Sequence, residues 1–91
     1  VYEMLRLISF FTIAETEIRA WSIPRGTHAV EAAGKVHSDM ERGFIRAEVI
    51  NFGEFERLGS MQAARDGGRL RLEGKDYEVR DGDLIKIRFH V

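Results

Sequence analysis

The clearest strand of this sequence is Leu84-Ile85-Lys86-Ile87-Arg88-Phe89-His90-Val91. Successive side chains of a strand point to opposite faces, so the alternation of apolar and basic residues predicts one face in the core and one face in contact with solvent or a ligand. The residues expected to point into the core are Ile85, Ile87, Phe89 and Val91. The residues expected on the outer face are Lys86, Arg88 and His90.

Three more strands follow from the same pattern. The runs Leu7–Ile13 and Glu17–Ile23 are rich in aromatic and β-branched residues and are separated by a short polar gap, which predicts a β-hairpin that ends at Pro24. A further strand is predicted over Ile45–Ile50. Its inward residues are expected to be Ile45, Ala47 and Val49.

One main helix is predicted between the hairpin and the strand at Ile45–Ile50. Thr27 is a suitable N-cap residue, and Ser38-Asp39-Met40-Glu41 has the pattern of a capping box. We therefore favour a helix that breaks near His37 and restarts as a short helix ending at Gly43. The apolar residues spaced to share one helical face are Ala29, Ala33, Val36, Met40 and Phe44.

The rest of the chain predicts short elements. Two helical turns are expected over 54–58 and 60–66, separated by Gly59 and ended by Gly67 and Gly68, and short strands are expected over 69–73 and 75–79 around Gly74. Asp81-Gly82-Asp83 marks another turn before the last strand. Hairpin, helix, strand, helical turns and closing strands together predict an α+β fold of the β-grasp type, with a mixed sheet packed on one main helix.

Composition limits the class of protein. With 91 residues the chain has room for one domain, over 1–91, with one core. The absence of cysteine excludes disulfides and thiolate chemistry and favours the cytoplasm. The apolar run Leu7–Ala14 is shorter than the roughly 20 residues of a membrane span, so no membrane association is expected. Residues 1–6 are expected to be the end of a preceding linker helix, in a chain cut from a longer protein.

Catalytic and metal motifs are weak. A P-loop would need a glycine where Ala29 stands and a serine or threonine where Val36 stands, so the Gly34-Lys35 pair does not predict phosphate binding. His37, Asp39 and Glu41 carry metal-ligand atoms, but their spacing does not place all three on one helical face. The three histidines are dispersed, and no local pattern sets one of them as the activating base of a serine, so no independent active site is predicted.

The outer row of the last strand is the main candidate for a functional surface. Phosphate oxygens are natural partners for Lys86, Arg88 and His90. An extension of this row is expected from Arg69, Arg71 and Lys75 on nearby strands. The competing interpretation is that these charges only keep a strand soluble and prevent edge pairing, which the net charge of −1 favours.

Several stretches of the sequence carry a resemblance to a known family. They are Arg19–Ile23, the long block Ala32–Ile50, Leu70–Tyr77, Asp81–Asp83 and Ile87–Val91. Together they span nearly the whole chain, which is similar to the C-terminal TGS domain of the YchF/Obg-like ATPases.

The resemblance implies a ubiquitin-like β-grasp TGS domain. It also implies a parent P-loop ATPase or GTP-binding protein that uses ATP or GTP with Mg²⁺ in an N-terminal domain, so no cofactor and no catalytic residue is expected here. The expected partners are that ATPase domain and, for the parent, the ribosome or RNA. The module is expected to be monomeric. Its expected contacts with RNA or the ribosome are Lys86, Arg88, His90, Arg69, Arg71 and Lys75. The alternative is a purely structural brace for the ATPase domain, without RNA contact.

Overall fold

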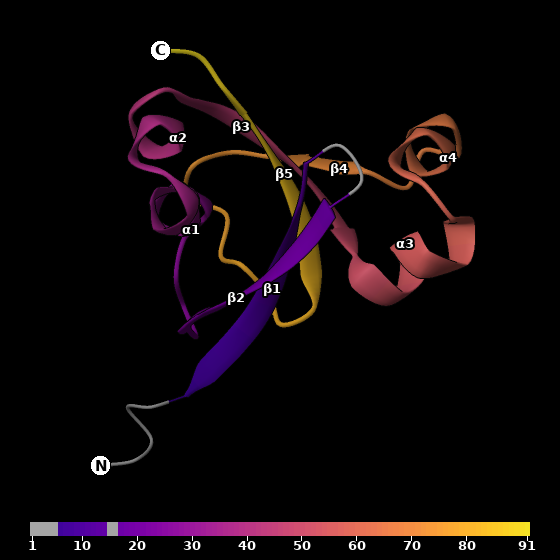
Figure 1. The fold of residues 1–91 in the computed structure, drawn as a ribbon, viewed down its shortest axis with the longest axis horizontal. Helices are drawn as coiled ribbons and strands as arrows, with labels where there is room; N and C mark the ends of the chain where they lie inside the picture. Colours follow the sequence, from indigo (N-terminus) through magenta and orange to yellow (C-terminus); the bar gives the residue numbers. More distant parts are fainter. Residues whose placement is uncertain (1–5, 15–16) are drawn as a thin grey trace.

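The computed structural model describes residues 6–14 and 17–91. Within them the strands form one five-stranded sheet in the order β2-β1-β5-β3-β4 (Figure 1). These strands are β1 (Leu7–Ala14), β2 (Glu17–Pro24), β3 (Phe44–Asn51), β4 (Arg71–Glu73) and β5 (Asp83–Phe89). β5 pairs in parallel with β1 and antiparallel with β3, so the sheet is mixed, as predicted.

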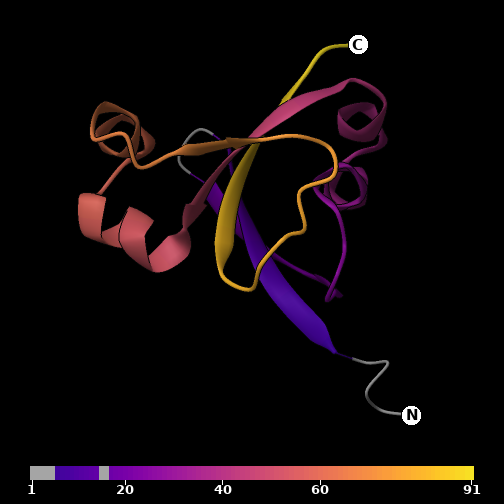
Figure 2. The same cartoon turned by 180° about the vertical axis from the view of Figure 1, so that it is seen from behind.

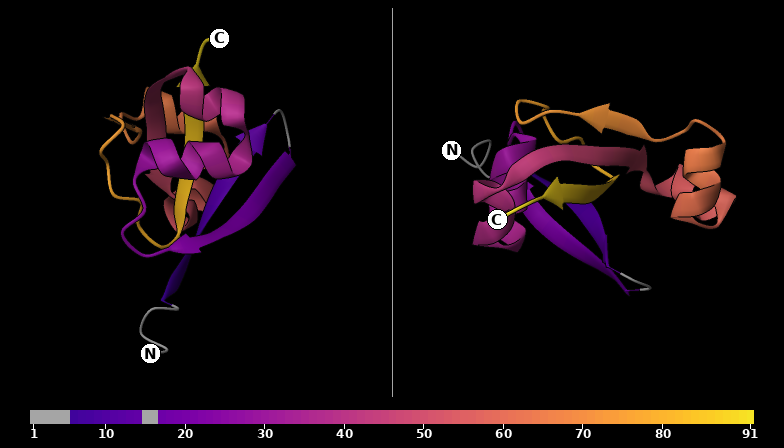
Figure 3. Two further views of the ribbon diagram at one scale, coloured as in Figure 1. Left: turned by 90° about the vertical axis from the view of Figure 1, so that its left-hand side faces the viewer. Right: turned by 90° about the horizontal axis from the view of Figure 1, so that it is seen from above.

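Helices cover both faces of this sheet, in two separate places. The helices α1 (Ala29–Val36) and α2 (Ser38–Arg42) pack on one face, and α3 (Phe52–Leu58) and α4 (Met61–Asp66) lie at the other end of the molecule (Figures 2 and 3). The larger apolar cluster lies under α1 and contains Ile8, Phe10, Ile23, Ala32, Val49 and Ile85. A smaller cluster beneath α3 and α4 contains Ile50, Phe55, Ala64 and Leu84.

The helix after the hairpin breaks where the sequence predicts, but with different caps. His28, not Thr27, is the N-cap of α1, and its backbone N–H donates to Oε1 of Glu31 at 3.0 Å. The hydroxyl of Thr27 instead donates to the carbonyl of Pro24. α2 is capped by His37, whose Nδ1 accepts a hydrogen bond from the backbone N–H of Asp39. The expected role of Ser38 as the cap is therefore wrong, because the imidazole supplies the acceptor one residue earlier.

The prediction that Ile45 points into the core is wrong. Phe44 pairs with Phe89 and Arg46 pairs with Arg88, so Ile45 is an extra residue on β3 at a bulge. The bulge resets the alternation and buries Phe44 while Ile45 is 53% exposed. Ala47 and Val49 point inward as predicted.

The end of the last strand also differs from the prediction. Ile85 is buried and Ile87 packs against the main cluster, but Phe89 is 40% exposed and Val91 is 66% exposed. β5 ends at Phe89, and the chain continues past α2 at this end (Figure 1). Leu84 on the opposite face is fully buried under α3 and α4, so the beginning of β5 has a core on both sides.

The segment expected as a strand over 75–79 runs beside α1 instead of pairing with β4. The carbonyl of Tyr77 accepts from the backbone N–H of Ala29, and the backbone N–H of Val79 donates to Thr27. Only an isolated bridge between His28 and Glu78 is formed. The segment therefore fixes the start of α1 and buries Val79 in the main cluster.

The expectation of a helix end over residues 1–6 falls almost wholly outside the described residues. Arg6 itself is described, and its carbonyl accepts a hydrogen bond from the backbone N–H of Arg25. In the described ranges, no helix has the length and apolar character needed to cross a membrane.

Candidate functional site

Two of the candidate residues lie on the sheet face that α3 and α4 partly cover. Lys86 and Arg88 follow the buried Leu84 on the same side of β5. Lys86 borders a depression shared with Phe55 of α3 and Met61 of α4. His90 follows the end of β5 and is held by a backbone hydrogen bond from its N–H to the carbonyl of Gly43.

The register of β3 and β5 adds a third cation to this face. Arg46 lies directly opposite Arg88, and Glu48 lies directly opposite Lys86. Directly opposed residues of antiparallel strands share a face, and like charges in that position destabilise the pairing. The sequence reveals Arg46 as a strand residue but does not give its register, which is why this residue was absent from the predicted set.

Glu48 lies between two arginines from different elements. It is 6% exposed. Its Oε1 lies 3.2 Å from a terminal nitrogen of Arg65 in α4, and its Oε2 lies 3.5 Å from a terminal nitrogen of Arg88 in β5. We call Arg46, Glu48, Arg65, Lys86 and Arg88 the basic face. Arg65 was also absent from the predicted set, because its contact with β3 depends on how α4 folds back on the sheet.

A depression of 520 Å³ opens on the basic face. Part of its lining is apolar and exposed, since Ile45 and Leu72 are 53% and 60% exposed. Its lining residues are Ile45, Arg46, Glu48, Leu72, Arg88, Phe89 and His90. The surface thus combines cationic and apolar contact groups, with Phe89 as an exposed aromatic residue that the sequence placed in the core.

The structure does not bring the other three candidates to the basic face. Arg71 on β4 pairs with Val49 on β3. The side chain of Val49 is in the main cluster, on the face opposite to the basic face. A terminal nitrogen of Arg71 lies 3.8 Å from Asp83. Arg69 pairs with Glu54 at 3.0 Å, and Lys75 lies exposed in the turn after β4.

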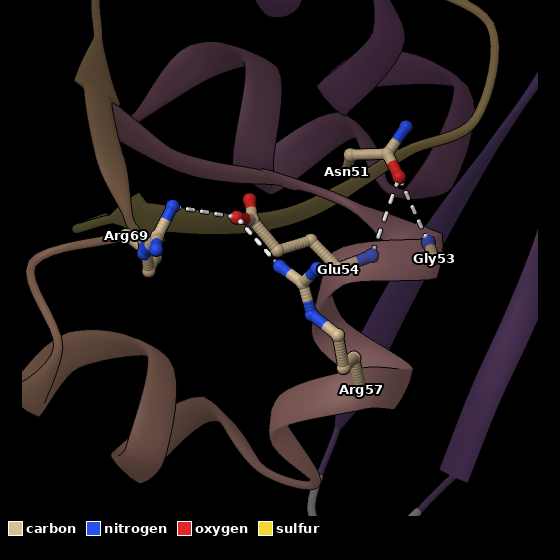
Figure 4. A network of polar contacts seen from close by, with 5 residues as sticks. All are labelled: Asn51, Gly53, Glu54, Arg57 and Arg69. Atoms are coloured by element: carbon tan, nitrogen blue, oxygen red, sulfur yellow. Dashed lines mark hydrogen bonds and ion pairs between the residues drawn. The ribbon is translucent and has the colours of Figure 1, made fainter.

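Glu54 is the centre of a separate polar network (Figure 4). Its Oε2 accepts from Arg57 at 3.3 Å and from Arg69 at 3.0 Å. The side chain of Asn51 caps α3, because its Oδ1 accepts from the backbone N–H of Gly53 and of Glu54. This network ties α3 to the segment before β4, and it occupies Arg69 with an internal partner.

Asp83 is the second buried acid and lies in a different network. It accepts a hydrogen bond of 2.6 Å from the hydroxyl of Tyr77 and one from the backbone N–H of Arg80. Burial raises the pKa of Tyr77 to about 12, and the hydrogen bond to Asp83 and its charge act in the same direction. Arg71 donates to the same hydroxyl and opposes that shift.

The segments weighed for phosphate and metal binding have structural roles. Gly34 lies inside α1, where an added Cβ would be 3.2 Å from Cβ of Glu41 in α2, so this glycine allows α1 and α2 to pack closely. His37 is the cap of α2. In the ranges 6–14 and 17–91, no three His, Asp or Glu side chains are arranged to hold a metal ion.

The strand order and the helix that follows the hairpin define a ubiquitin-like β-grasp domain. A sequence model for the C-terminal domain of YchF GTPases, described as "Protein of unknown function (DUF933)", matches residues 7–90. The chain therefore belongs to this family of C-terminal domains.

Curated relatives agree with this assignment. The chain is 49% identical over 90 residues to the "Ribosome-binding ATPase YchF" of Bacillus subtilis (strain 168), covering 99% of this chain and 25% of that protein. It is 47% identical over 89 residues to "Obg-like ATPase 1" of Danio rerio, covering 98% of this chain and 22% of that protein. The chain spans about a quarter of the length of the curated relatives it matches.

Solved structures show the same fold. The YchF GTPase of Schizosaccharomyces pombe matches with a TM-score of 0.83 and 34% identity, over 96% of this chain and 23% of that one. A GTP-binding protein from Pyrococcus horikoshii OT3 matches with a TM-score of 0.66 and 26% identity, over 99% of this chain and 23% of that one.

Proposed function

We propose that this chain is a non-catalytic module of a YchF-type ATPase that contacts the ribosome through RNA phosphates. The observation that carries the proposal is the direct opposition of Arg46 and Arg88 on one sheet face, with Lys86 and Arg65 beside them. A like-charge pair weakens the sheet, so its presence calls for a partner that supplies negative charge. Phosphate oxygens accept hydrogen bonds from arginine in pairs, which neutral protein surfaces do not offer.

The proposal also draws on the relatives. Proteins named as ribosome-binding ATPases match this chain over 99% of its length. Their nucleotide chemistry would belong to the part of the protein beyond this chain, with ATP or GTP and Mg²⁺ bound there. An ATPase domain of the same protein would then be an intramolecular partner, and the cytoplasm the compartment.

The test is co-sedimentation of this chain with purified ribosomes over a salt series. The double variant Lys86→Ala with Arg88→Ala removes two cations from the basic face and should weaken binding and flatten its salt dependence, because fewer counterions are released. A matched double variant, Arg25→Ala with Lys35→Ala, removes two exposed cations elsewhere and should bind like the unaltered chain. Equal binding by both double variants at matched salt would refute the surface assignment.

A structural brace is the second candidate function. It is favoured by internal ion pairing, since Arg88 pairs with Glu48, Arg69 with Glu54 and Arg71 with Asp83. The net charge of −1 points the same way. In that case this chain should not sediment with ribosomes even at about 50 mM salt, where electrostatic binding is strongest. Retained binding at that salt concentration would exclude a pure brace.

A further inference from the structure

Glu48 is buried, and the two arginines that it contacts are more exposed than it is. Its side chain is 8% exposed, whereas the side chains of Arg65 and Arg88 are 41% and 50% exposed. The acid is therefore beneath the two guanidinium groups, which extend towards solvent. Each guanidinium has five N–H donors, and Glu48 contacts one terminal nitrogen of each. Among the described residues, most donors of both arginines are left for another acceptor.

Charge on this surface is unbalanced. Arg46, Arg65 and Arg88 carry three positive charges against the single negative charge of Glu48. Arg46 is held opposite Arg88 by the strand register and lines the same depression. A second anion on the outer side of the guanidinium groups would relieve both the excess charge and the repulsion within the Arg46–Arg88 pair.

We propose that Arg46, Arg65 and Arg88 form a binding site for a backbone phosphate of RNA, and that Glu48 is the residue that positions it. The site rests on the proposed function and deepens it, because it names the ligand group. It also adds three residues to those expected from the sequence, namely Arg46, Glu48 and Arg65. Glu48 holds two long side chains in one arrangement before the ligand arrives, so less rotamer freedom is lost on binding. A phosphate in this position is recognised by charge and hydrogen-bond geometry and carries no base sequence.

The positioning role of Glu48 and its negative charge predict opposite changes in RNA affinity when the carboxylate is removed. An acid close to a polyanion site repels the ligand, so removal of its charge alone should strengthen binding. Removal of a positioning residue should weaken it. The variant Glu48→Gln keeps the shape of the side chain and separates the two effects by the sign of the change.

The experiment measures binding of this chain to ribosomes by co-sedimentation and to labelled poly(U) by fluorescence anisotropy, each over a salt series. Poly-glutamate serves as a probe for an acidic protein partner. The variants are Glu48→Gln, Arg65→Ala and the matched control Arg57→Ala, which removes another exposed arginine paired with a single acid at 3.3 Å. Circular dichroism establishes that each variant is folded, and Arg65→Ala decides the matter if Glu48→Gln does not fold.

We expect Glu48→Gln to bind both RNA ligands more weakly at matched salt, in spite of its added positive charge. We expect Arg65→Ala to lower affinity by about tenfold, which corresponds to about 1.4 kcal/mol. Its salt slope on poly(U) should fall by about 0.7, the loss of one phosphate contact on a single strand. Arg57→Ala should match the unaltered chain in its binding to ribosomes, its binding to poly(U) and its salt slope.

Three outcomes would contradict the inference, and they differ from failure of the proposed function. If Lys86→Ala with Arg88→Ala abolishes ribosome binding while Arg65→Ala has no effect, the phosphate site is wrong and the proposed function remains. Tighter binding by Glu48→Gln would reduce Glu48 to a repelling charge. Binding to poly-glutamate but not to poly(U) would assign the arginines to an acidic protein. If the unaltered chain binds neither ribosomes nor poly(U), the proposed function fails together with the site.

Discussion

The hydroxyl of Tyr77 donates a hydrogen bond of 2.6 Å to Oδ2 of Asp83, which joins the segment beside α1 to the first residue of β5. Asp83 is 3% exposed, so the hydrogen-bond donors around it replace the water that its carboxylate loses on burial. Tyr77→Phe keeps the ring and removes one of those donors. We expect it to lower the free energy of unfolding by about 1.5–3 kcal/mol, the range for a hydrogen bond to a charged group. Urea denaturation measures this, and an unchanged midpoint would contradict it.

The burial of Tyr77, together with its hydrogen bond to Asp83, predicts a loss of stability at alkaline pH. The folded chain raises the pKa of Tyr77 to about 12, above the ordinary tyrosine value of 10.0. Between these two pH values the unfolded state releases the phenolic proton first, so the unfolded state binds fewer protons and stability falls as pH rises. The contribution is complete below pH 10 and lost through pH 12.

Spectrophotometric titration of tyrosinate tests that shift directly. The chain has two tyrosines, so the variant Tyr2→Phe leaves Tyr77 as the single titrating tyrosine. Denaturation of Tyr77→Phe across the same pH range should lack the alkaline decrease that belongs to this residue. Equal pH dependence in the presence and absence of the Tyr77 hydroxyl would exclude it as the cause.

Asn51 is predicted to stabilise α3 through its cap. Asn51→Ala removes an acceptor for the backbone N–H groups of Gly53 and Glu54 and should cost about 1 kcal/mol. α3 and α4 cover only the smaller apolar cluster. In Asn51→Ala we therefore expect hydrogen exchange to be faster in these two helices than in the sheet. Asn51→Asp retains an acceptor and a favourable charge at a helix start and should preserve stability. Loss of stability in Asn51→Asp equal to that in Asn51→Ala would show that the cap is not the cause.

Arg46 should show a conflict between stability and binding. Arg46→Thr keeps β propensity and removes the like-charge pair with Arg88. The free energy of unfolding should therefore rise by about 0.2–1 kcal/mol. The same change should weaken binding to ribosomes and to poly(U), because one phosphate contact is lost. Parallel melting and binding measurements on one preparation test both effects. A variant that is less stable, or that binds equally well, would contradict this account of the basic face.

The sequence predicts most of the strands and the broken helix, because these depend on local patterns. The alternation in 84–88 and the apolar runs of the hairpin each identify a strand without knowledge of its neighbours. The break near His37 is also predicted, although the cap of α2 is His37 and not Ser38. Membership of the family was also recognised from the sequence, and the match over residues 7–90 confirms it.

Errors arose where side-chain direction depends on other elements. One extra residue at Ile45 changes which residues of β3 face the core, and alternation alone does not reveal a bulge. Phe89 has the pattern of a core residue but is the last residue of β5 and is 40% exposed. Arg46 and Arg65 reach the basic face only through strand register and the return of α4, which no local signal contains.

The position of β5 has a consequence for biosynthesis. β5 lies at the centre of the sheet, between β1 and β3, yet it follows the other four strands in the chain. A ribosome therefore translates the hairpin and β3 well before the strand that joins them, and the contact of Ser9 with Asp81 closes a separation of 72 residues. Because the hairpin and β3 are joined only by that last strand, we expect the complete sheet to form in one late, cooperative event. A nascent chain that stops before Asp83 should leave two apolar strand edges open to chaperones or aggregation.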